Sequence, residues 1–165
     1  RRIQGLFRVP GFGTEAPYNG SKWYGPVLEL GLSGFCQPAC PGLHRAKPVD
    51  LVGISFAECR DAIRRIHEQG ADAVMILHSF SLFKVRNVRY DGIRLDRVVA
   101  GRFRRLCRWL GERTETYPVR TFARLAEDVR AGTYEPLAVS PCGLGRPVRA
   151  LARRAVQMVN NWYWV

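Results

Sequence analysis

An apolar segment that directly follows an amphipathic segment constrains the fold of this chain most. Residues 73–77 read Ala-Val-Met-Ile-Leu without a polar interruption, and such a run is typical of a strand buried on both faces, as parallel strands are. The preceding residues favour a helix, because Ser55 and Glu58 form a capping-box pattern and Gly70 suits the end of a helix. The apolar positions between them recur at helical spacing: Phe56, Cys59, Ile63 and Ile66. The sequence therefore predicts a helix followed at once by a buried strand.

Further strand and helix patterns alternate along the chain. Strands are expected at 27–32 and, more briefly, at 118–120, and helices are expected after the N-cap residues Asp96 and Thr121 and over 147–159. Their expected apolar faces are Val99, Phe103, Leu106 and Leu110 in the first helix, Phe122, Leu125, Ala126 and Val129 in the second, and Val148, Leu151, Ala155 and Val159 in the third. Strands that alternate with helices imply βαβ units and a parallel sheet.

We therefore expect the α/β class, with parallel strands and outer helices arranged as a partial (β/α) barrel. Glycine and proline predict loops over 1–25 and 34–54, and 81–95 is expected to be a third loop. Three strands are too few to close a barrel, and the chain begins without Met, so we expect further sequence upstream. Residues 1–132 are assigned to the C-terminal part of the barrel and 133–165 to an extension with one helix.

Composition excludes two classes of protein. Of the 165 residues, 47% are hydrophobic, which is too many for a disordered chain. The longest apolar runs are too short to cross a bilayer, and the start lacks the apolar core of a signal peptide. We therefore expect no membrane span and a cytoplasmic location.

The chain is strongly basic, with a formal net charge of +12 that comes almost wholly from arginine. Residues 101–165 hold twelve arginines against five acidic residues. A basic stripe is typical of phosphate binding, but these arginines fall on the polar faces of several helices and no recognition motif accompanies them. We interpret them as solvated helix faces, and nucleic acid is not the partner we expect.

The chain has five cysteines, an odd number that does not suggest a disulfide framework. Cys59 and Cys107 fall on helix faces expected to be buried. Cys36, Cys40 and His44 resemble part of a zinc site, but a fourth ligand is missing and the spacing is not that of a zinc knuckle. Packing is the favoured interpretation, and no metal is expected on this chain.

His78 follows the predicted strand 73–77 directly. Functional groups of parallel α/β proteins collect where strands end, and an imidazole suits proton transfer near neutral pH. A histidine that only caps the strand end through hydrogen bonds is an equally simple interpretation. Position alone does not decide between the two.

Four segments resemble NodB-type polysaccharide deacetylases. Val74-Met-Ile-Leu-His-Ser-Phe-Ser-Leu is similar to the family's last motif, an aliphatic residue and a histidine at a strand end. Gly25-Pro-Val-Leu-Glu-Leu-Gly-Leu-Ser resembles an earlier family strand, although Gly31 stands where proline is usual. Arg102-Phe-Arg-Arg-Leu-Cys-Arg-Trp-Leu and Val119-Arg-Thr-Phe-Ala-Arg-Leu-Ala-Glu resemble its closing helix, strand and helix. The resemblance covers roughly residues 24–130.

This resemblance implies metal-assisted removal of an acetyl group from a sugar. His78 would be the general acid, and Ile76 would line the pocket for the acetyl methyl group. Phe7-Arg-Val-Pro-Gly is similar to the family's Arg-x-Pro motif, so Arg8 would orient the base and Pro10 would line the substrate. The family's Asp-Asp and His-x3-His motifs, which hold a divalent metal such as zinc, are absent here. We therefore expect an incomplete or inactive deacetylase-like piece.

Two other functions remain open. In the first, the same fold serves as a carbohydrate-binding or interaction module, in which a sugar stacks on Trp23, Tyr24 or Tyr90. The expected partners are then an acetylated saccharide and a protein or upstream segment that completes the fold. A basic nucleic-acid-binding domain is the second alternative.

Overall fold

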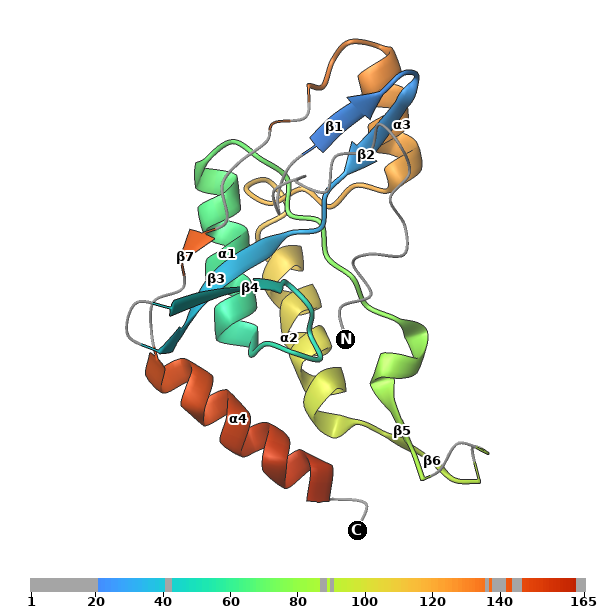
Figure 1. The fold of residues 1–165 in the computed structure, drawn as a ribbon. Coiled ribbons are helices and arrows are strands. Elements are labelled where there is room, and N and C mark those ends of the chain that lie inside the picture. Colours follow the sequence, from blue (N-terminus) through green and yellow to red (C-terminus); the bar gives the residue numbers. More distant parts are fainter. Residues whose placement is uncertain are drawn as a thin grey trace.

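The computed structural model describes residues 21–40, 43–86, 89, 91–135, 137, 142–143 and 147–162 (Figure 1). It is a mixed α/β structure. Its elements are β1 (Ser21–Tyr24), β2 (Val27–Leu30), β3 (Gly34–Cys40), β4 (Leu43–Pro48), α1 (Phe56–Glu68), the short 3-10 helix η2 (Ser79–Leu82), β5 (Phe83–Val85), β6 (Ile93–Leu95), α2 (Arg97–Gly111), α3 (Phe122–Arg130), β7 (Cys142–Gly143) and α4 (Pro147–Trp162).

The four α-helices begin and end close to where the sequence predicts. The Ser55 hydroxyl accepts the Glu58 amide, and the Glu58 carboxylate accepts the Ser55 amide, which completes the predicted capping box of α1. Asp96 caps α2 and Thr121 caps α3 through their side chains. Gly70 has the positive φ, 77°, that suits a residue just beyond a helix.

The predicted parallel sheet is not formed by the described residues, and no barrel is seen in them. β2 pairs antiparallel with β1, and β5 pairs antiparallel with β6. The β1–β2 turn consists of Gly25, with φ 57°, and Pro26. A glycine with positive φ at the first of two turn positions is typical of a tight hairpin. This local turn chemistry joins neighbouring strands directly, without the helical crossover that parallel pairing needs.

The predicted loop over 34–54 was also wrong. Its first part forms the β3–β4 hairpin, in which β3 also pairs in parallel with β7 over two residues. Pro38 is accommodated because the register shifts between Pro38 and Cys40, and proline is tolerated at such irregularities. β7 pairs only with Phe35 and Cys36 of β3, so Pro38, which has no N–H, does not have to donate a hydrogen bond to β7.

The segment 73–77 is not the doubly buried strand that was predicted. It forms one isolated parallel bridge, between Ile76 and Asp50. Met75 and Leu77 pack on the core, whereas Ile76 is exposed, so only one face of the segment is buried. The predicted strand at 118–120 is not formed either. Within the part of the chain that the structure describes, neither segment has the neighbouring strands that would complete its hydrogen bonds.

The hydrophobic core lies between the β3–β4 hairpin, α1 and α2 (Figure 1). Its buried members are Phe35, Val49, Leu51, Ile54, Cys59, Ala62, Ile63 and Leu106. On α2, the buried positions are Val99, Arg102 and Leu106, whereas Phe103, predicted to point inward, is exposed. Cys107 is likewise exposed and not buried as predicted. The burial of Arg102 shows that the basic faces are not uniformly solvated.

Candidate functional site

His78 is placed on an exposed edge of the structure by the alternation of the segment that precedes it. Met75 and Leu77 contact the core, while Ile76 and His78 are exposed. Alternate residues of an extended segment point to opposite sides. Ile76 and His78 therefore lie on the same, outward side of the segment. This placement is compatible with the prediction that Ile76 lines a substrate pocket and His78 acts as the general acid.

The His78 ring stacks on the Phe80 ring. The two ring centroids are 4.8 Å apart and the rings are nearly parallel, at 6°. His78 is the residue immediately before η2, and its carbonyl accepts the Ser81 amide at 2.9 Å. Its side chain makes no capping hydrogen bond to η2. Among the described residues, the imidazole is therefore not used as the cap of η2.

Two contacts fix the segments on either side of His78. Ser33 is buried and binds Val74 through both its backbone and its hydroxyl. After η2, the Leu82 carbonyl accepts the Asp96 amide at 2.8 Å. The His78–Phe80 pair is thus held between the core and the start of α2.

The other predicted site residues do not gather around His78. Trp23 and Tyr24 belong to the β1–β2 hairpin, which lies at the other end of the molecule from β5 and the short helix before it (Figure 1). Trp23 is half exposed and faces Leu28 in the strand register. Arg8, Pro10 and Tyr90 lie outside the described residues, so the structure does not test them.

The residues of this chain do not fit the metal centre that the resemblance implies. The whole sequence has three histidines, and no motif supplies an aspartate with two of them. No group of three metal-ligating side chains occurs in the part of the chain that the structure describes. Cys36, Cys40 and His44 fall on β3 and β4, where their side chains are not described. We therefore derive no chemical step through a metal.

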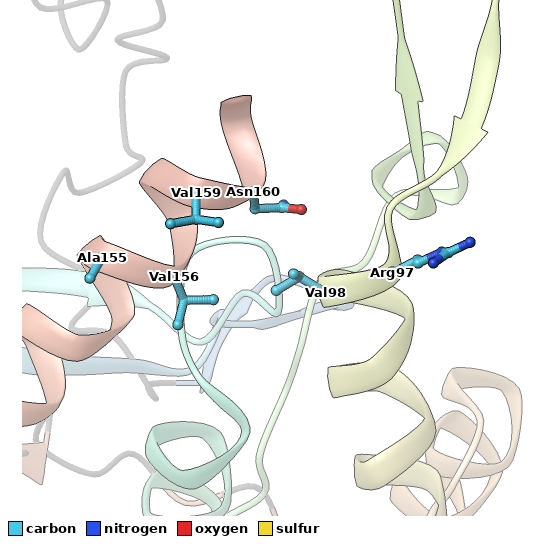
Figure 2. A pocket seen from close by; sticks show the side chains of 6 residues that line it. All are labelled: Arg97, Val98, Ala155, Val156, Val159 and Asn160. Atoms are coloured by element: carbon cyan, nitrogen blue, oxygen red, sulfur yellow. The ribbon is translucent and has the colours of Figure 1, made fainter. Parts of the chain in front are cut away.

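Two adjoining cavities lie between α2 and α4, away from His78. The first, of about 470 Å³, is lined by Arg97, Val98, Ala155, Val156, Val159 and Asn160. Figure 2 shows Val98 opposite Val156, while the Arg97 side chain extends away from α4. The second, of about 390 Å³, shares Arg97, Val98 and Val156 with the first and adds further arginines from both helices. Neither cavity includes His78 or Ile76.

The polar contacts that hold α4 were missed at the sequence level. Arg153 is buried, forms an ion pair with Glu58 at 3.2 Å and donates to the Gly53 carbonyl at 2.6 Å. Arg149 pairs with Asp61. A signal was present in the absence of acidic residues on α4, since an arginine that is buried there needs a partner on another element. Phe80 was missed as well, although it stands two residues after His78.

Comparisons with known proteins give no family. No family model, no curated protein and no solved structure matches this chain. Among the described residues, no helix is both long and apolar enough to cross a bilayer.

Proposed function

We propose that this chain is part of a carbohydrate deacetylase-like protein, in which its own residues hold an acetylated saccharide and present an imidazole to the leaving group. The observation that carries the proposal is the exposed, stacked pair of His78 and Phe80. The pair follows Ile76, which lies on the same side of the segment.

An exposed aromatic ring suits the apolar face of a pyranose. The Phe80 side chain is 67% exposed, and its stack with His78 limits its orientation. The imidazole beside it is suited to protonate the nitrogen or oxygen of a departing sugar. In this step a water oxygen forms the new bond to the acyl carbon and loses one proton to solvent, while the bond from the acyl carbon to the sugar breaks. The imidazolium gives its proton to the departing nitrogen or oxygen, so that acetic acid, the deacetylated sugar and the neutral imidazole result.

A saccharide titration tests the recognition surface. The 165-residue chain is titrated with an N-acetylglucosamine oligomer, and the imidazole proton signals are followed by NMR. Only three histidines contribute, so His78→Gln and His67→Gln assign the signals. We expect saturable shifts at His78 and unchanged signals at His67.

Phe80→Ala is expected to weaken this binding by about two- to tenfold, a loss in the range of about 0.5–1.5 kcal/mol that stacked pairs of aromatic rings contribute. Phe122→Ala is the matched control, because Phe122 is also 67% exposed. Equal weakening by both variants, or no saturable shift at His78, would remove the site from consideration.

A non-catalytic carbohydrate-binding module is the second candidate. It is favoured by the absence of metal-ligating groups noted above for the described residues. Acetate release from the same oligomer, measured with added zinc, separates the two. Release that is lost in His78→Gln while binding is retained supports the deacetylase role. Binding without release assigns the chain to the module.

A further inference from the structure

Helix α4 has an unusual orientation. Its buried positions are Ala150, Arg153 and Asn160, and its large apolar side chains face outward. The exposed set consists of Val148, Leu151, Val156, Met158, Val159 and Trp162. At 3.6 residues per turn these side chains cover roughly 160° of the helix surface. A helix at the surface of a globular protein normally turns such a face toward the core.

Polar contacts fix this orientation. Arg149 pairs with Asp61, Arg153 pairs with Glu58, and Asn160 donates to Asp96. Lys84 also donates to the Asn160 carbonyl. Because these contacts lie along one side of α4 from its first turn to its last, most of the apolar face stays exposed, and its Val156 edge borders the cavity next to Val98 at the start of α2.

The surroundings of this apolar face are positively charged. Of the eight arginines of α2 and α4, Arg149 and Arg153 pair with acidic residues and Arg102 is buried. The other five are exposed: Arg97, Arg104, Arg105, Arg108 and Arg154. Arg97 and Arg105 line the cavities next to Val156, on one border of the apolar face. Arg154 is exposed on α4 itself, toward the other border. An apolar face flanked by arginines complements a partner whose apolar interior lies beneath a layer of negatively charged groups.

We propose that α4 is an interfacial helix, which lays its exposed apolar face on an anionic lipid bilayer. Its 16 residues lie in the plane of the membrane and do not cross it, since a span needs about 20 residues. Trp162 and the arginines have the side-chain types favoured at the level of the headgroups. The apolar cavity beside Val98 and Val156 extends the surface available to acyl chains (Figure 2). This role uses a different surface from the saccharide site and does not depend on it.

Vesicle sedimentation tests the proposal. The probes are vesicles of phosphatidylcholine alone and of phosphatidylcholine mixed with phosphatidylglycerol. We expect binding to the anionic vesicles, weakened by added salt because screening shortens the range of the charges. Equal binding to both vesicle types, or no binding to either, would overturn the proposal.

A matched pair of triple variants locates the surface. Val148→Gln/Leu151→Gln/Met158→Gln replaces side chains that are 77%, 70% and 58% exposed, so the fold should be kept. We expect it to reduce vesicle binding by roughly tenfold or more. The control Val119→Gln/Phe122→Gln/Ile93→Gln replaces side chains that are 74%, 67% and 59% exposed on other segments and should bind as the parent chain does. A comparable loss in the control would contradict the assignment to α4.

A second copy of this chain is the competing partner for the apolar face of α4. Sedimentation velocity without lipid is expected to show a monomer. A concentration-dependent dimer that disappears in the α4 triple variant would overturn the proposal in favour of a second copy. Phe80→Ala should retain vesicle binding, so failure of the saccharide site and failure of this surface are distinguishable.

Discussion

Asn160, near the end of α4, donates its side-chain amide to both carboxylate oxygens of Asp96, at 3.2 and 3.0 Å. The same carboxylate accepts the backbone amides of Val98 and Val99 at the start of α2. One buried acidic group therefore both starts a helix and holds the end of another, 64 residues further along the chain. This link is one reason why the polar side of α4 faces inward.

Asp96→Ala should be more destabilising than the loss of a helix cap alone. Removal of a cap costs about 0.5–2 kcal/mol, and here the buried Asn160 amide is also left without its partner, which costs about a further 1–3 kcal/mol. Thr121→Ala is the control, because Thr121 caps α3 from an exposed position. Denaturant unfolding of the three chains measures the difference. Equal losses would show that the Asn160 contact contributes nothing.

Ser33→Ala should weaken the placement of the segment that leads to His78. The Ser33 hydroxyl accepts the Val74 amide at 2.7 Å in a buried setting. Without it that amide is unsatisfied, and the free energy of unfolding should fall by about 1–3 kcal/mol. Hydrogen exchange at Val74 should also accelerate. Thr116→Ala, at an exposed position, should change neither quantity, and an unchanged exchange rate in Ser33→Ala would contradict the role.

Arg102→Met should destabilise the chain although it replaces a charge by an apolar group. Arg102 donates from one nitrogen to the Leu51 and Val52 carbonyls, at 2.9 and 3.0 Å. Burial lowers the pKa of its guanidinium, but the two carbonyls would lose their partner in the variant. We expect a loss of about 1–3 kcal/mol in thermal or denaturant unfolding. The exposed neighbour Arg104→Met should stay within about 0.5 kcal/mol of the parent.

The two described free cysteines should differ sharply in reactivity. Burial raises the pKa of the Cys59 thiol to about 12, whereas Cys107 is exposed. Alkylation at pH 8 followed by peptide mass spectrometry should label Cys107 in the folded chain and Cys59 only after denaturation. Labelling of Cys59 at a comparable rate without denaturant would show that the core opens locally.

The Cys59 thiol also predicts a dependence of stability on pH. Above pH 9 the thiol of the unfolded chain ionises, while the folded chain keeps its proton up to about pH 12. The unfolded state then binds fewer protons, so stability should fall with rising pH in this range, by up to about 1.4 kcal/mol per pH unit. Cys59→Ala should remove this part of the slope. Identical slopes for the two chains would contradict the assignment.

The sequence by itself determined the helices of this protein. Ser55 with Glu58, Asp96 and Thr121 mark helix starts through hydrogen bonds that reach only two or three residues along the chain. Gly70 marks an end through its own backbone conformation. Such signals are read correctly from sequence because every group involved lies within one turn of the others.

Only the tertiary structure decided that β7 pairs with the distant β3 and which side of each helix is buried. The apolar pattern of α4 predicts an inward face, but contacts of Arg153 with Glu58 and of Asn160 with Asp96 turn that face outward. Similarly, Arg102 takes an inward position that Phe103 was expected to occupy. These choices depend on partners dozens of residues away, and hydrophobic spacing carries no information about where a distant carboxylate or carbonyl will lie.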